Sequence, residues 1–211
     1  MATSKKRKDN FKGKLGNTVS YPLNGQVVTR EIGFSKKDPS IPQLTIRLKT
    51  KMITALLKPV LPFVGIGFES ETKKSLLSPY NLATSINWLN AVVGDYPNFK
   101  IDFSKVLFSK GTIPVNNQVM VGTTVGGLKF SWDNSANLAK MSDNDHVMLM
   151  AYCPEKDCAF CQLDGDKRRV GFEEIFLPRY HETVLMHTYV AFISSDRKSI
   201  SNSLYTGTVM W

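Results

Sequence analysis

The chain has 211 residues, 42% of them hydrophobic, so it can bury a sizeable core and is not a disordered chain. No uninterrupted apolar run has membrane-spanning length, because the longest candidate, residues 52–68, contains Lys58, two prolines and two glycines. The N-terminus lacks the apolar segment of a secretion signal, so we expect a location in the cytoplasm or within an assembled particle.

The net charge of +9 is concentrated at one end of the chain. Residues 1–60 carry 13 basic and three acidic side chains, whereas the remaining 151 residues carry 14 basic and 15 acidic ones. This asymmetry is typical of a protein that meets a polyanion with one end only. The alternative is that the basic end only aids solubility.

Residues 1–10 are predicted to form a flexible basic arm, because they contain no residue able to anchor a core. The arm contains four consecutive cations: Lys5, Lys6, Arg7 and Lys8. Gly13 and Gly16 alternate with Lys12 and Lys14, and we expect them to extend the arm as a flexible lead-in.

A β-hairpin is predicted to follow, with paired strands at residues 17–23 and 26–32. Asn24-Gly25 is the strongest short-range signal for a two-residue hairpin turn, because both residues tolerate positive φ angles. Pro22 lacks a backbone donor, so its strand should be at an edge or bulged at this position. Arg30 adds a further cation to the second strand.

An amphipathic helix is predicted from Ser40 and Gln43, which have the spacing of a capping box. Leucine and methionine recur every fourth residue on one face, and basic residues line another face. The apolar positions are Leu44, Leu48, Met52 and Leu56, and the basic positions are Arg47, Lys51 and Lys58. Pro59 should end or kink this helix, and residues 61–68 are interpreted as a packed turn or short strand.

A second helix is predicted between Ser78, which can cap it, and Gly94, which can stop it, with Pro79 in its first turn. Its expected apolar face is formed by Leu82, Ile86, Leu89 and Val93. Residues 101–108 begin with alternating apolar residues and are predicted to form a strand, and residues 111–114 are predicted to be a domain boundary.

The final hundred residues show seven short apolar segments with turn signals between them, which is typical of a β-sandwich. The predicted strands are 118–124, 128–132, 146–152, 158–163, 169–177, 187–193 and 203–210. Trp132 and Tyr189 are the expected core anchors. The predicted fold class is therefore α+β, with an arm (1–10), a hairpin and helical domain (11–114) and an antiparallel β-sandwich (115–211).

Three C-terminal segments, 127–132, 188–192 and 199–203, together resemble a fibronectin type III or related immunoglobulin-like domain. Such domains pair a tryptophan early in one sheet with a tyrosine in the penultimate strand. They commonly serve as adhesive or spacer modules, so the resemblance implies protein contacts made by the sandwich.

A second resemblance covers nearly the whole chain. It rests on GKLGNTVSYPLNGQVVTR, the Pro42-Gln43 helix start, YPNF at 96–99, KVLFSKG at 105–111 and SNSLYTGTV at 201–209. These segments resemble a bacterial family of uncharacterised function with the same order of hairpin, helices and sandwich. The opening segment is also similar, more weakly, to small proteins of phage-derived gene clusters. Neither the bacterial family nor these phage-associated proteins imply a known activity or site.

The three cysteines have the spacing Cys153-x4-Cys158-x2-Cys161, part of which occurs in plant-type iron–sulfur sites. Such a site needs a fourth cysteine, and a zinc site would need a histidine from His146, His181 or His187. A simpler interpretation is a hairpin that places Cys153 opposite Cys158 and turns Cys161 to the other face. We therefore expect no metal and no cofactor.

No catalytic motif is present in the sequence. His181-Glu182 begins like a zinc-protease helix, but the position of the second histidine holds Leu185. No Gly-x-Ser-x-Gly elbow or phosphate-binding loop occurs. Two acidic pairs, 143/145 and 164/166, could bind calcium weakly, and the alternative that they are solvated turn residues is favoured.

The sequence thus predicts a non-catalytic structural or assembly protein, as found in a phage-like or other large particle, with a basic N-terminal docking region and a sandwich that contacts other protein subunits. Oligomers are compatible with this prediction, and no membrane contact is expected. The alternative is a protein that binds RNA or DNA, for example on the ribosome, through residues 1–60, with lysine and arginine on phosphates and Phe11 or Tyr21 stacked on a base. In either case the binding residues are expected to be Lys5, Lys6, Arg7, Lys8, Lys12, Lys14, Arg30, Arg47 and Lys51, facing the same way.

Overall fold

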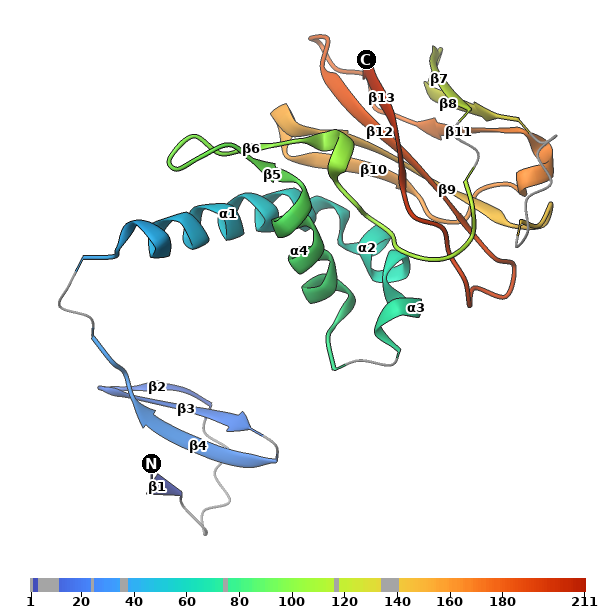
Figure 1. Ribbon diagram of the computed structural model, residues 1–211. Coiled ribbons are helices and arrows are strands. Elements are labelled where there is room, and N and C mark those ends of the chain that lie inside the picture. Colours follow the sequence, from blue (N-terminus) through green and yellow to red (C-terminus); the bar gives the residue numbers. More distant parts are fainter. Residues whose placement is uncertain are drawn as a thin grey trace. The chain divides into compact units, whose positions relative to one another are not determined.

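The computed structural model describes residues 2–3, 12–23, 25–34, 38–73, 76–115, 118–133 and 141–211. The chain divides into two compact units, Met1–Ser40 and Ile41–Trp211 (Figure 1). The sequence placed a boundary at 114/115 instead. No boundary lies at 114/115 because the helices and the C-terminal sheets share a core.

The first unit is a four-stranded antiparallel sheet with the strand order β1-β4-β3-β2. Its strands are β1 (Ala2–Thr3), β2 (Gly13–Leu15), β3 (Thr18–Leu23) and β4 (Gln26–Glu31). The predicted hairpin is confirmed: Leu23 pairs with Gln26 across the two-residue turn, and Gly25 has a φ of +78°.

Two predictions for this unit are wrong. Ala2 and Thr3 are not part of a free arm, because they pair with Thr29 and Val28 on β4. Residues 13–15 are not a flexible lead-in, because they pair with β3 and form an edge strand. Pro22 is tolerated because the pairing of β2 reaches only to Ser20, so no neighbour on that side requires a donor from Pro22.

The second unit begins with a helical segment. Its elements are α1 (Ile41–Leu57), a 3-10 turn (Lys58–Val60), α2 (Leu61–Gly67), α3 (Glu69–Thr72) and α4 (Pro79–Asn90). The predicted α1 is confirmed, and Pro59 lies in the 3-10 turn that follows it. Residues 61–67 form a helix and not a turn or strand, because Pro62 occupies the first helical turn, where no donor is needed.

The predicted α4 is confirmed at its start, where the Ser78 hydroxyl accepts a hydrogen bond from the Asn81 backbone N–H at 3.2 Å. Its buried face is centred on Ala83 and Asn87, and the predicted face is wrong at Leu89, which is 69% exposed. The Asn87 side-chain amide bonds both the N–H and the C=O of Leu107.

Residues 101–108 do not form the predicted strand. Only Lys100–Ile101 (β6) forms a strand here, and it pairs with Val92–Val93 (β5). A 3-10 turn, Phe103–Lys105, follows because the Asp102 carboxylate accepts the Ser104 backbone N–H at 3.1 Å and caps the turn.

All seven predicted C-terminal strands are present. They are β7 (Val119–Thr124), β8 (Gly127–Trp132), β9 (His146–Cys153), β10 (Cys158–Gln162), β11 (Phe172–Phe176), β12 (Leu185–Ile193) and β13 (Leu204–Met210). They form two antiparallel sheets, with the orders β10-β9-β12-β13 and β11-β8-β7. The fold class is therefore α+β, as predicted.

The four-stranded sheet is the middle of three layers (Figure 1). One face of β9 and β12 packs against the helices, through Met148, Met150, Tyr152, Tyr189, Ala191 and Ile193. The opposite face packs against β8 and β11, through Val147, Leu149, Ala151, Cys153, Val190 and Phe192. The expected anchors Tyr189 and Trp132 are both buried, on the helix side and the sandwich side respectively.

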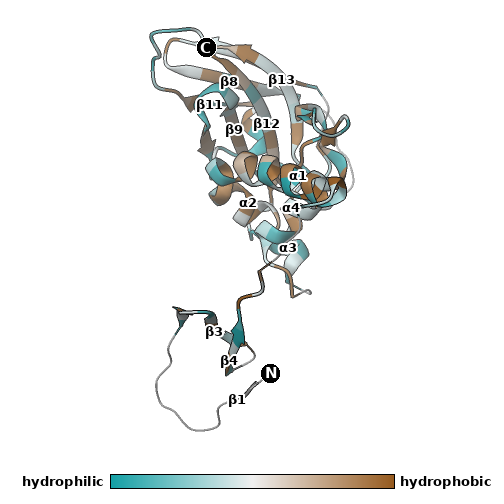
Figure 2. Ribbon diagram, turned by 90° about the vertical axis from the view of Figure 1, so that its left-hand side faces the viewer, coloured by the Kyte–Doolittle hydropathy of each residue, from teal (hydrophilic) through white to brown (hydrophobic). Residues whose placement is uncertain are grey.

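The helical run Ile41–Gly67 is long and apolar enough to cross a membrane by length and composition alone. In the structure its apolar side, which includes Ile53, Leu57 and Phe63, is buried in the core of the second unit. Figure 2 shows hydrophobic and hydrophilic residues interspersed along α1, as expected for a helix with one covered face.

Two of the segments that carry the family resemblance interlock. The Ser203 hydroxyl accepts the backbone N–H of Phe108 at 2.8 Å, and the Ser109 hydroxyl donates to the Ser201 carbonyl at 2.9 Å. The Gly111 N–H donates to the Asn202 side chain at 3.0 Å. These residues therefore fasten the segment after α4 to the start of β13, which is a structural role.

Candidate docking surfaces

The first unit presents one basic face. The register pairs Val19 with both Lys14 and Arg30, so these three side chains lie in one row on the same side of the sheet. Tyr21 is two residues along β3 and shares this side, and the Arg30 guanidinium lies 5.8 Å from its ring centroid. We call Lys14, Val19, Tyr21, Val28 and Arg30 the basic face.

The opposite face of the same sheet carries the acidic residue. Glu31 pairs with Thr18, and Thr18 pairs with Leu15. On this side the hydroxyls of Ser20 and Thr29 are 2.8 Å apart, which confirms that the two residues share a face. The charges of β2, β3 and β4 are therefore segregated, with cations on one side and the carboxylate on the other.

Among the residues of the first unit whose burial is described, 12–23, 25–34 and 38–40, none is buried. Leu15 is 69% exposed and Leu23 is 52% exposed, and the side chains of β3 are at most half-buried. A sheet normally buries one face against another layer, and an isolated sheet without a covered face is marginally stable. This sheet therefore lacks the core that the second unit has.

Four of the predicted binding residues, Lys5, Lys6, Arg7 and Lys8, lie outside the described residues. Phe11, one of the two aromatic residues expected to stack on a base, also lies outside the described residues. Lys12 is described and exposed, and it directly precedes β2.

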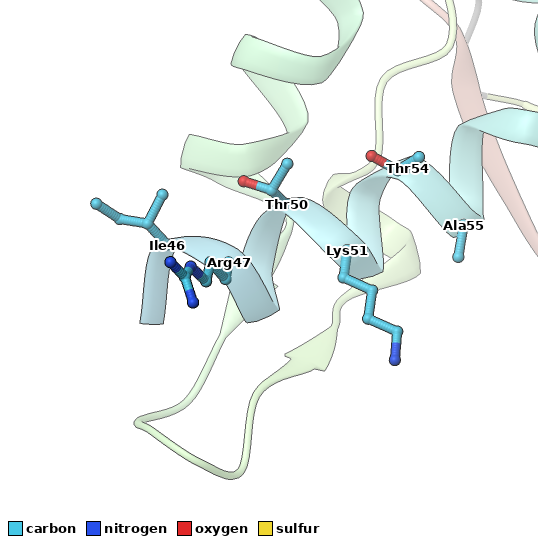
Figure 3. Close-up of a pocket in the computed structure, with 6 residues that line it drawn as sticks. All are labelled: Ile46, Arg47, Thr50, Lys51, Thr54 and Ala55. Atoms are coloured by element: carbon cyan, nitrogen blue, oxygen red, sulfur yellow. The ribbon is translucent and has the colours of Figure 1, made fainter. Parts of the chain in front are cut away.

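The second unit carries a separate basic surface on α1. Arg47 and Lys51 are exposed, lie one turn apart and line a surface pocket together with Ile46, Thr50, Thr54 and Ala55 (Figure 3). The sequence of α1 contains no acidic residue that could neutralise these cations. Like charges at this spacing destabilise a helix by about 0.2–0.5 kcal/mol, so an anion bound here would relieve a repulsion.

Lys49, between these two cations in sequence, has a structural role. Its ammonium lies 5.0 Å from the Trp88 ring centroid and 4.8 Å from that of Phe99. These cation–π contacts fix α1 against α4 and the segment that follows it.

Within the described part of the chain, no carboxylate forms an ion pair with Lys12, Lys14, Arg30, Arg47 or Lys51. Cations elsewhere in the second unit do have such partners, for example Lys105 with Asp102 at 3.1 Å and Arg197 with Asp164 at 2.7 Å. The structure brings Lys14 and Arg30 together on one face, and Arg47 and Lys51 together on another. The two pairs belong to different units, so their common orientation stays a prediction.

Sequence reasoning missed an apolar surface on the outer side of the three-stranded sheet. Met120, Phe172 and Phe176 are 73%, 45% and 79% exposed, and Val125 at the neighbouring turn is 87% exposed. Lys129 on β8 lies 4.2 Å from the Phe172 ring centroid. Exposed aromatic and methionine side chains gathered on one face are typical of a protein contact surface.

The cysteines adopt the predicted hairpin arrangement. Cys153 pairs with Cys158 across β9 and β10, and Cys161 faces the opposite core. Burial raises the pKa of the Cys161 thiol to about 12 and raises that of Cys153, which disfavours the reactive thiolate. Among the described residues, no group of three or more His, Cys, Asp or Glu is arranged to hold a metal ion.

Asp145 is not a solvated turn residue, contrary to expectation. It is buried and forms an ion pair with the equally buried Arg168, at 3.5 Å. Burial raises the pKa of the Asp145 carboxyl, and the Arg168 guanidinium opposes this shift. The guanidinium also lies 3.7 Å from the Phe192 ring centroid, and the Arg168 carbonyl accepts the Trp132 indole N–H at 2.7 Å. The pair is a structural element of the sandwich core.

Comparisons with known proteins identify the family of the chain but indicate no activity. No curated protein and no solved structure matches it. A family model described as a family of unknown function (DUF6266) matches residues 10–207, which is most of the chain. The protein therefore belongs to this family of unknown function, DUF6266.

Proposed function

We propose that the protein is a non-catalytic docking and assembly component. In this proposal the second unit is the rigid scaffold, and the first unit is the element that docks on a partner. The observation that carries the proposal is the contrast between the two units. Ile41–Trp211 has two buried clusters, whereas none of residues 12–23, 25–34 and 38–40 of the first unit is buried. A sheet without a core gains its missing layer from a partner.

We further propose that the sandwich is of the fibronectin type III or related immunoglobulin-like kind. The strand order supports this assignment. The first, second and fifth sandwich strands form one sheet, and the fourth, third, sixth and seventh form the other. In the constant-type immunoglobulin arrangement the fourth strand joins the first sheet, and here it pairs with the third strand instead. Trp132 on the second strand and Tyr189 on the sixth also fit the proposal.

Such modules commonly make protein contacts, and the exposed side chains of Met120, Phe172 and Phe176 offer a surface for them. The similarity of the opening segment to proteins of phage-derived gene clusters supports placing the protein within a larger particle. We propose that the partners of the sandwich are other protein subunits.

The test is sedimentation of the full chain in a nuclease-treated lysate of the cells that produce it. We expect it to sediment faster than a 23.7 kDa monomer, and the change Phe176→Asp to shift it toward the monomer. Leu76→Asp is the control, because Leu76 is fully exposed and is not on the sandwich. A wild-type chain that sediments only as a monomer would contradict the proposal.

A further inference from the structure

We propose that the basic face of the first unit binds single-stranded nucleic acid. This inference rests on the proposed docking role of the unit and names its partner. The basic face combines the two components of such sites, since Lys14 and Arg30 can contact phosphates and Tyr21 offers an aromatic ring on which a base can stack.

Charge segregation favours a polyanion on this face. The register directs Lys14 and Arg30 to one side of the sheet and Glu31 to the other, so an approaching phosphate meets no carboxylate from β2, β3 or β4. The sequence adds to this charge, because Met1–Ser40 contains nine basic and three acidic residues. Neutralising several cations by phosphates releases counterions, which drives binding at low salt.

The aromatic ring favours a nucleic acid over an acidic protein. Tyr21 is half-buried, and the register places it next to Val28 and on the same side of the sheet as Val19. The Arg30 guanidinium above it adds a second planar group. An acidic peptide needs only the cations, whereas an unpaired base uses the ring as well.

The test measures binding of fluorescent oligo-dT and oligo-rU to the purified full chain, with a duplex and poly-glutamate as competing ligands. We expect both single strands to bind, with an affinity that falls steeply with salt. Lys14→Glu with Arg30→Glu should weaken binding at least about tenfold and reduce the slope of log affinity against log salt by about 1.4, which corresponds to two phosphate contacts. Tyr21→Ala should weaken binding about fivefold or more.

Two matched controls separate the face from the overall charge. Lys100→Glu with Lys156→Glu makes the same change of net charge on the second unit, and it should change affinity less than about twofold. Val28→Glu and Val27→Glu place the same new charge on adjacent residues of β4 that point to opposite faces. We expect Val28→Glu to weaken binding clearly more than Val27→Glu, and circular dichroism should show that each variant is folded like wild type.

Equal effects of the two valine variants would overturn the proposed face. Poly-glutamate that competes as well as oligo-dT, together with an unchanged affinity of Tyr21→Ala, would identify an acidic protein as the partner. The assembly role would then stand while this inference fails. Conversely, a chain that binds the oligonucleotides but is a monomer in nuclease-treated lysate would contradict the assembly role and leave the nucleic-acid site in place.

Discussion

At the scale of single residues, two glycines of α2 have opposite roles. Gly67 lies against the chain: a Cβ atom there would be 2.3 Å from the Phe108 carbonyl oxygen, and the Gly67 carbonyl accepts the Lys110 N–H at 2.9 Å. Gly65, one half-turn earlier, has no atom within 4 Å of such a Cβ. Only Gly67 is therefore required for the close approach of two backbone segments.

We expect Gly67→Ala to lower the free energy of unfolding by about 1–3 kcal/mol or more, because backbone atoms have to move apart. Gly65→Ala should raise it by about 0.5–1 kcal/mol, because alanine is a better helix former and meets open space. Urea denaturation of both variants measures the difference. If both substitutions changed the free energy of unfolding in the same direction, the described packing of α2 against residues 108–110 would be wrong.

His187 gives the protein a predicted dependence on pH. Its ring is largely buried, stacks on Phe103 with centroids 3.7 Å apart, and has Nδ1 3.0 Å from the Tyr205 hydroxyl. Burial lowers the pKa of His187 below its ordinary value of 6.5. As the pH falls below this value, the unfolded chain takes up the proton before the folded chain does. The contribution of His187 to the free energy of unfolding is therefore fully present above about pH 6.5 and is lost progressively below it.

The measurement is the free energy of unfolding from about pH 8 to about pH 5, for wild type and for His187→Gln. Glutamine keeps a polar group near Tyr205 but does not titrate, so the variant should lose less stability on acidification. The two proteins differ only at residue 187, so the contributions of all other residues, His146 and His181 included, cancel in the comparison. Identical slopes would show that His187 does not cause the acid sensitivity.

At the scale of elements, the sequence predicted the features that depend on short-range interactions, such as hairpin turns and helix starts. Asn24-Gly25 predicted the hairpin, and the two-residue loop also determines its register, so the shared face of Val19 and Arg30 could have been derived from the sequence. Ser78 and Pro79 predicted the start of α4. The spacing of Arg47 and Lys51 predicted their common ridge on α1.

Other elements depend on tertiary contacts that no local pattern reveals. The strand β2 was missed because Gly13 and Gly16 favour flexibility, and its pairing with β3 outweighs that preference. Residues 101–108 were predicted as a strand from apolar alternation. Instead, the backbone N–H groups at 107 and 108 donate hydrogen bonds to the side chains of Asn87 and Ser203. The apolar surface around Phe176 could not be assigned, because alternation does not tell which face of a strand is covered.

At the scale of the whole molecule, the predicted domain boundary failed because the middle sheet is covered on both faces. The sequence contained the signal: HVMLMAYC in β9 and LMHTYVAFI in β12 are nearly continuous apolar runs, whereas a strand with one solvated face alternates. The helices therefore belong to the sandwich body, and the compact unit is Ile41–Trp211.

This architecture predicts that the sandwich cannot fold without the helices. In a fragment of residues 115–211, the side chains of Met148, Met150, Tyr152, Tyr189 and Ile193 would lose the layer that covers them. Fully burying one such side chain stabilises a protein by about 1.5–3 kcal/mol. The combined loss is therefore of the same order as the free energy of unfolding of a whole domain, about 5–15 kcal/mol. We expect the 115–211 fragment to aggregate or unfold, and a 41–211 fragment to unfold cooperatively with native near-ultraviolet circular dichroism. A soluble, cooperatively folding 115–211 fragment would instead establish an autonomous sandwich domain and restore the boundary near residue 114.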